Sequence, residues 1–267
     1  MSDTSISIII PFYRASTYIA SLSESINSQT LKPSEVIILN NDPHVKIHPS
    51  DFNLSVPTVV INTPPRNVIL ARIIGLHSST SKYIAFLDAD DQWYPEKLET
   101  QISVMLESGL DWCGSVANIC DLSGNFLARS PLVISPTSPI KILLGKVTVP
   151  MSSLLIRRSL LISLRCPDIF YSLFPSMLNI CDHGDLLYRL FRASSGVIIN
   201  EPLCVYTVGS NVSISSNKSI SVFRVCLLTY FLSNIRLRTF DISDFPHIVI
   251  HLCRTMISRL YHLIVRR

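Results

Sequence analysis

The feature that most constrains the fold is an alternation, over the first 90 residues, between apolar runs of strand length and segments with helical spacing. Buried strands are predicted for the β-branched or apolar runs at residues 6–10, 35–39, 57–61 and 83–87. Helices are predicted between them, at residues 16–29 and 68–77. Continuous apolar strands separated by amphipathic helices are typical of an open, mostly parallel α/β sheet covered on both faces.

The rest of the chain continues with fewer regular signals. Pro95 fits the first turn of a helix that runs to about Ser108, and strands are expected at 111–119 and 197–208. A Pro- and Ser-rich loop is expected at 130–139, and an amphipathic helix at 182–194. From residue 221 the pattern is helical to the end, which divides the chain into a domain at 1–220 and a helical tail at 221–267.

Charge is spread unevenly over these two parts. Residues 1–220 hold 16 Lys or Arg and 17 Asp or Glu, whereas residues 221–267 hold seven Arg and two Asp. A basic amphipathic segment favours an anionic membrane surface as its neighbour. The alternative is a packed helical pair with a solvated basic face. Nucleic acid is not expected as a partner, because the charges are sparse and no binding motif is present.

Cysteine spacing and hydropathy exclude several other classes of protein. The seven cysteines never form a C-x-x-C pair, so neither a disulfide framework nor a zinc site is expected. The first 13 residues lack the features of a signal peptide, and no uncharged apolar run reaches the length of about 18 residues that a bilayer span needs. The expected location is therefore cytoplasmic.

Polar residues that directly follow the predicted strands are the candidate site, because ligands of open α/β sheets bind beyond the carboxyl ends of the strands. Asp88, Asp90 and Asp91 place three carboxylates within four residues. Their mutual repulsion and hard oxygens predict a divalent cation, Mg²⁺ or Mn²⁺, bound together with substrate phosphates. The alternative is an acidic turn in which Asp91 caps the next helix.

Four motifs in this order resemble the family 2 glycosyltransferases, inverting enzymes with the GT-A fold that include bacterial surface-polysaccharide enzymes. They are Ile-Ile-Ile-Pro-Phe-Tyr at 8–13, Ala-Arg-Ile-Ile-Gly at 71–75, Leu-Asp-Ala-Asp-Asp at 87–91 and Pro-Glu-Lys-Leu at 95–98. The resemblance implies that Asp88 and Asp90 hold the metal and the ribose and diphosphate of a nucleotide-sugar. It also implies that Arg72 lies near the nucleotide or its phosphates; alternatively, Arg72 is a surface arginine of its helix.

The same resemblance assigns the remaining donor residues. Pro11 and Tyr13 belong to the opening turn of the nucleotide-sugar site. Asn40 and Asn41 stand where the family commonly has two aspartates that contact the base, and an amide still offers a donor and an acceptor there. Thr207 stands where the family usually has an arginine, so one diphosphate contact is expected to be missing.

Catalysis by inversion needs a general base that removes the proton of the acceptor hydroxyl. The stretch Asp-His-Gly-Asp-Leu-Leu-Tyr-Arg-Leu at 182–190 resembles the family's base motif, with His183 at the position of the catalytic aspartate. Either Asp182 or His183 is the expected base, and a degenerate, inactive site is the third alternative. Without a catalytic role, Asp182 would be a helix N-cap.

The resemblance implies the transfer of a hexose or N-acetylhexosamine from a nucleotide-sugar, with a UDP-sugar favoured. The acceptor is expected to be a saccharide or a polyprenyl-linked sugar in O-antigen, capsule or lipopolysaccharide synthesis, at the inner face of the membrane. The alternative is a catalytically silent GT-A module that binds nucleotide-sugar or partner proteins, because Asn40, Asn41, His183 and Thr207 all depart from the family pattern.

Overall fold

A computed structural model describes residues 3–65, 67–130, 149–164, 186–187, 190–191 and 194–209 of the chain. Almost all of the predicted loop at 130–139, the start of the predicted helix at 182–194 and the whole predicted tail at 221–267 lie outside the described residues. The boundary at residue 220 also lies outside them, so the division into two domains stays a prediction.

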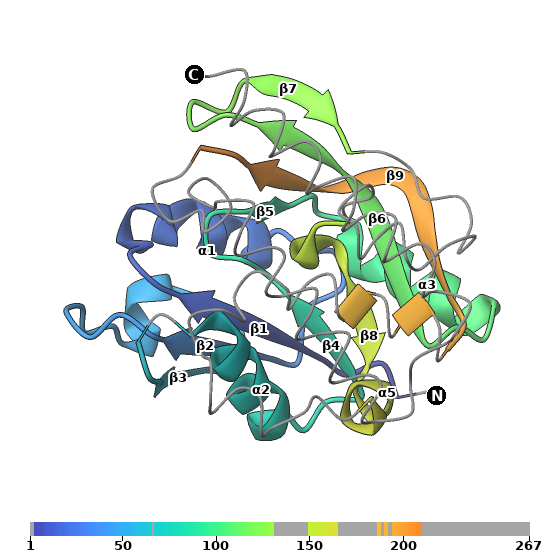
Figure 1. The fold of residues 1–267 in the computed structure, drawn as a ribbon, viewed down its shortest axis with the longest axis horizontal. Coiled ribbons are helices and arrows are strands. Elements are labelled where there is room, and N and C mark those ends of the chain that lie inside the picture. The colour runs from blue at the N-terminus through green and yellow to red at the C-terminus, as the bar shows by residue number, and fades with distance from the viewer. Residues whose placement is uncertain are drawn as a thin grey trace, which may run out of the picture.

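The described residues form a nine-stranded sheet, and its first half is parallel, as the sequence predicts (Figure 1). Its strands are β1 (Ile6–Phe12), β2 (Glu35–Asn40), β3 (Thr58–Asn62) and β4 (Tyr83–Phe86). β1 lies between β2 and β4, and β3 pairs with β2. Parallel order places the carboxyl ends of all four strands at one edge of the sheet.

The second half of the sheet is mixed, which the sequence did not indicate. β8 (Leu155–Arg157) runs antiparallel to β4 and to β6 (Trp112–Cys120). β9 (Gly196–Thr207) is parallel to β6 and antiparallel to β5 (Gln92–Trp93), and β7 (Phe126–Arg129) forms a hairpin with β6. The expected α/β class is confirmed, but parallel pairing dominates only the first half of the sheet.

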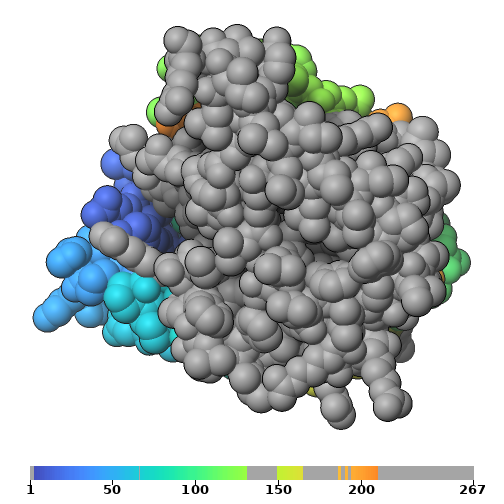
Figure 2. Space-filling view, in the orientation of Figure 1, coloured from blue at the N-terminus to red at the C-terminus, as the bar shows by residue number. Residues whose placement is uncertain are grey.

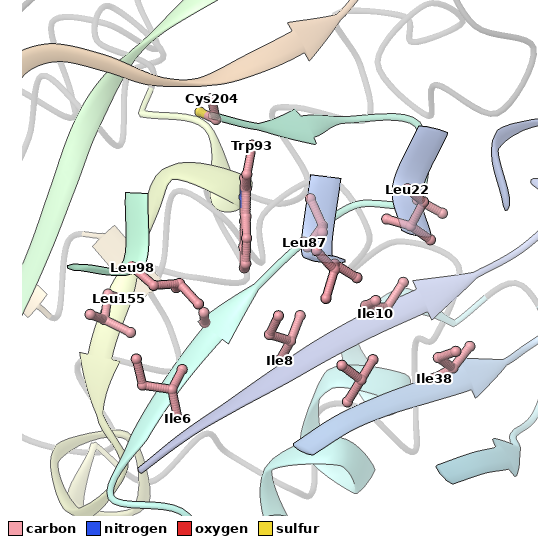
Figure 3. Close-up of a cluster of buried hydrophobic side chains, with 14 of the residues drawn as sticks. Ile6, Ile8, Ile10, Leu22, Ile38, Leu87, Trp93, Leu98, Leu155 and Cys204 are labelled. Carbon is pink, nitrogen blue, oxygen red and sulfur yellow. The ribbon is translucent and has the colours of Figure 1, made fainter. Parts of the chain in front are cut away.

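Helices cover both faces of the sheet, and the alternation along β1 shows why. Ile6, Ile8 and Ile10 point to the same face as α1 (Ile19–Asn27) and α3 (Lys97–Glu107) and belong to the core cluster of that face (Figure 3). Ile9 belongs to the cluster on the other face, with α2 (Val68–Ser78) and α5 (Arg158–Ser163). Because β1 is buried on both faces, it reads as one continuous apolar run.

The described part of the chain has no helix that is long and apolar enough to cross a membrane.

In the space-filling view the β7 hairpin, in green, lies at the upper edge of the molecule (Figure 2). Residues of the first strands and helices, in blue to cyan, lie along one side.

Candidate functional site

The predicted donor residues lie at the carboxyl edge of β1, β2 and β4. The main-chain amide of Asn41, just after β2, donates to the carbonyl of Phe12 at the end of β1 at 3.0 Å. The amide of Leu87, just after β4, donates to Ile9 of β1 at 3.1 Å and leads directly into the turn from Asp88 to Asp91. Tyr13, Asn41 and Asp88 therefore follow three adjacent strands at one edge of the sheet.

Arg72 forms an ion pair with the first of the three aspartates. A guanidinium nitrogen of Arg72 lies 2.5 Å from Oδ1 of Asp88, and the two side chains are 10% and 32% exposed. The guanidinium also lies 5.9 Å from the centre of the Phe86 ring. The alternative that Arg72 is a surface arginine is therefore wrong, because α2 presents it to the carboxyl edge of the sheet.

Asp91 differs from its two neighbours because it points into the protein. It is 1% exposed, and its two oxygens accept hydrogen bonds from the Ser152 hydroxyl at 2.5 Å and the Thr207 amide at 3.0 Å. Burial raises the pKa of Asp91 well above its ordinary value, and the nearby Asp88 and Asp90 carboxylates raise it further. The residue before α3 is Glu96, so the alternative in which Asp91 caps that helix is wrong.

Tyr18, in the short turn η1 (Ser16–Tyr18), is a residue that the sequence did not single out. Partial burial raises the pKa of its phenol, and the negative charge of Asp90 raises it further. The phenol therefore lies within electrostatic range of Asp90. Many tyrosines serve only in packing, and the sequence around Tyr18 contains no motif that distinguishes it from them.

The two asparagines after β2 have different surroundings. The Asn40 amide donates to the Val45 carbonyl at 2.9 Å and to Oδ1 of Asn62 at 3.0 Å, and its oxygen accepts from the Asp42 amide at 3.2 Å. Asn40 is thus engaged in organising the turn after β2. Oδ1 of Asn41 is buried and accepts no hydrogen bond from the described residues.

Pro11 and Tyr13 are placed by β1. Pro11 lies inside the strand, opposite Leu39 of β2, and is buried. Tyr13 is half-buried, and the guanidinium of Arg14 lies 5.3 Å from the centre of its ring. Arg14 has a positive φ of 53°, and its amide donates to the Asp42 carboxylate at 3.2 Å. That bond ties the turn after β1 to the turn after β2.

The sequence profile of Glycosyl transferase family 2 matches residues 7–164, which is more than half of the chain. The chain belongs to glycosyl transferase family 2. The match runs from the second residue of β1 through β8 and includes the whole turn from Asp88 to Asp91. It ends before the predicted general base.

Curated relatives of this family 2 chain come from several bacteria. The chain is 32% identical over 136 residues to an uncharacterized glycosyltransferase, YibD, of Escherichia coli K12, a stretch that covers 45% of this chain and 36% of YibD. It is 30% identical over 133 residues to the E. coli glucosyltransferase WfgD, covering 48% and 53% of the two chains. The chain therefore matches about a third to a half of the length of these two relatives. A Haemophilus influenzae glycosyltransferase is 27% identical over 80% of this chain and 82% of its own.

Solved structures show the same fold at low identity. S. aureus TarS in complex with UDP-GlcNAc superposes with a TM-score of 0.59 at 16% identity, over 84% of this chain and 66% of that one. The UDP complex of TarS gives a TM-score of 0.57 over 84% and 63% of the two chains. These matches establish the GT-A fold for this family 2 chain.

Two parts of the predicted site stay predictions. Asp182 and His183 lie outside the described residues, so the identity of the general base stays a prediction. Within the described residues, no group of three or more His, Cys, Asp or Glu side chains forms a complete metal site. Asp88 and Asp90 carry hard oxygen atoms of the kind that Mg²⁺ binds together with phosphates and water, and the cation site stays a prediction.

Proposed function

We propose that the protein is an inverting glycosyltransferase that moves a hexose or N-acetylhexosamine from a nucleotide-sugar, with UDP-sugars favoured. The acceptor is a saccharide or a polyprenyl-linked sugar in cell-surface polysaccharide synthesis. The observation that carries this proposal is the carboxyl edge of β1, β2 and β4, where Asn41, Asp88 and Arg72 lie together. An acidic turn beside a buried arginine suits a nucleoside diphosphate bound with a cation.

The names of the relatives support the same reaction class. WfgD is named a UDP-Glc:α-D-GlcNAc-diphosphoundecaprenol β-1,3-glucosyltransferase, and AmsB of Erwinia amylovora is named an amylovoran biosynthesis glycosyltransferase. TarS was solved with UDP-GlcNAc. These names motivate the UDP-sugar donor and the lipid-linked or polysaccharide acceptor.

Each residue at the edge has a proposed contact with the donor. Asn41, whose Oδ1 accepts no hydrogen bond from the described residues, offers an amide donor and acceptor toward the base, while Tyr13 packs beside the nucleoside. Pro11, inside β1, and Asn40, at the end of β2, lie just before the two turns that hold these side chains. Arg72 holds Asp88 toward the ribose and keeps positive charge near the diphosphate.

A divalent cation, Mn²⁺ or Mg²⁺, is proposed at Asp90, with Asp88 as the second carboxylate. The ion pair with Arg72 offsets part of the negative charge of Asp88. A bound cation would neutralise negative charge on the departing diphosphate. Asp182 or His183 is the proposed base that accepts the proton of the acceptor hydroxyl.

Donor binding tests this proposal directly. Calorimetric titration of UDP in the presence of Mn²⁺ is expected to show binding to the wild type. Asp90→Asn is expected to weaken that binding by about tenfold or more and to remove its dependence on Mn²⁺. Glu107→Gln, an exposed change at the end of α3, serves as the control and should bind as the wild type does. Equal affinity in D90N and the wild type would contradict the proposed cation site.

Peripheral membrane attachment through the basic tail at 221–267 is the remaining proposal, and the tail lies outside the described residues. Its arginines would add electrostatic attraction to anionic lipid. Replacing Arg254, Arg259, Arg266 and Arg267 by Gln in the full chain is expected to reduce sedimentation with phosphatidylglycerol vesicles. Undiminished sedimentation would favour a packed helical pair with a solvated face.

A further inference from the structure

Ser152 contacts both ends of the Asp88–Asp91 turn from a segment about 60 residues away in the chain. It lies in the turn η3 (Met151–Ser153) and is completely buried. Its hydroxyl donates to the carboxylate of Asp91 at 2.5 Å and accepts the main-chain amide of Asp88 at 3.0 Å. One side chain thus holds the first and the last aspartate of the acidic turn.

The orientation of the hydroxyl is determined by its partners. The Asp88 amide only donates, so it takes a lone pair of Oγ and leaves the hydroxyl proton for Asp91. The turn is closed on itself because the Asp91 amide donates to the Asp88 carbonyl at 3.0 Å. These bonds fix the direction in which the Asp88 and Asp90 side chains leave the turn.

The backbone of Ser152 is held by Trp93, which lies two residues after the acidic turn. Its carbonyl accepts the indole Nε1 of Trp93 at 2.7 Å, and Trp93 is buried beside Leu98 and Cys204 (Figure 3). The second oxygen of Asp91 accepts the amide of Thr207 at the end of β9. Ser152 therefore connects the acidic turn to the core and, through Asp91, to the last described strand.

We propose that Ser152 is a positioning residue of the donor site: it touches no substrate and sets the direction of the Asp88 and Asp90 carboxylates. This inference rests on the proposed function, because it assumes that these two carboxylates hold the donor. Loss of the hydroxyl leaves the Asp88 amide and the buried Asp91 carboxylate each without one partner. Unpaired buried groups are costly, so the turn is expected to rearrange.

Ser153 provides a matched control in the same turn. It is also completely buried, and its hydroxyl donates to the Pro150 carbonyl at 2.7 Å, away from the acidic turn. Ser152→Ala and Ser153→Ala therefore each remove one buried hydroxyl and one donated bond. Only the first releases Asp88 and Asp91.

The experiment measures UDP affinity with Mn²⁺ by calorimetry, and main-chain amide exchange of residues 88–91, in the wild type and both variants. S152A is expected to weaken UDP binding by about tenfold and to speed exchange at Asp88, whereas S153A changes affinity less than about twofold. Lower melting temperatures are expected for both variants and do not discriminate between them. If S152A does not fold, S152C and S153C replace the pair.

Two failures are distinguishable. Equal UDP affinity in S152A and S153A, with the wild type binding, overturns the role of Ser152 and leaves the proposed function standing. A wild type that binds no nucleoside diphosphate with or without Mn²⁺ overturns the proposed function, and the positioning role falls with it.

Discussion

Lys97 is a charged residue in the core near the acidic turn. The side chain is completely buried, and its ammonium donates to Gln101 at 2.7 Å and lies 4.2 Å from the centre of the Trp93 ring. Burial lowers the pKa of Lys97 to about 8. It raises that of the neighbouring Cys113 thiol to about 11 and of Cys204 to about 12. The Lys97 ammonium therefore loses its proton more easily than an exposed lysine does.

Replacing Lys97 by Met should make stability depend less on pH. Between the folded pKa of about 8 and the ordinary value of 10.5, the unfolded chain binds more protons than the folded one. Stability of the wild type therefore rises with pH in that window. Relative to K97M, we expect the free energy of unfolding of the wild type to rise by about 1 kcal/mol from pH 7 to pH 9.

Urea unfolding at several pH values measures this difference, with Lys46→Met, at an exposed position, as the control. The raised pKa values of Cys113 and Cys204 act in the opposite direction above their ordinary value of 9.0, so the comparison ends at pH 9. If the difference in free energy of unfolding between wild type and K97M stays constant from pH 7 to pH 9, the Lys97 ammonium does not titrate as expected.

The position of a residue in the fold could be predicted where the residue belongs to a short sequence motif. Asp88, Asp90 and Arg72 stand in local motifs, and their common edge follows from parallel strand order. Ser152 could not be predicted, because its contacts join segments about 60 residues apart and a Ser-Ser pair carries no local pattern. The sequence also could not predict that Asp91 points into the protein, because nothing in the motif distinguishes it from Asp88 and Asp90.

At the scale of elements, long apolar runs gave correct predictions and short strands did not. β1, β2 and β4 are buried on both faces, so their sequences are continuous apolar runs. β5 has two residues and β8 three, and such lengths cannot establish a period. Pairing of these short strands depends on their neighbours in the sheet, which is why the mixed half was missed.

Gly75 tests how closely α2 must approach the sheet. A Cβ at this position would lie 2.6 Å from Cγ2 of Ile9 and 3.0 Å from Cδ2 of Leu39. Gly75→Ala is therefore expected to destabilise the fold by about 1–3 kcal/mol through overpacking, although alanine is the better helix former. Because α2 carries Arg72, UDP affinity should fall as well.

Thermal and urea unfolding together with UDP titration measure both effects. Ser78→Ala, an exposed change at the end of the same helix, is the control for helix propensity. Unchanged stability and UDP affinity in G75A would show that the close approach of α2 to β1 contributes neither to folding nor to donor binding.

At the scale of the whole molecule, the modest net charge of +4 combines two unlike parts. The family match and the donor edge belong to the slightly acidic residues 1–220, whereas the basic excess belongs to 221–267. The described fold ends on β9, whose last residue, Thr207, is bonded to Asp91. The acidic turn thus joins the end of β4 to the last described strand.

The proposed function requires that the carboxylates at the edge of β1, β2 and β4 bind a nucleotide-sugar for glycosyl transfer. Its most direct test is the release of nucleoside diphosphate from UDP-Glc and UDP-GlcNAc by the full chain, with Mn²⁺ and a set of saccharide and polyprenyl-diphosphate-linked acceptors. We predict release by the wild type that depends on acceptor and on metal, and its loss in D90N. Release that is absent from the wild type, or equal in wild type and D90N, would contradict the account.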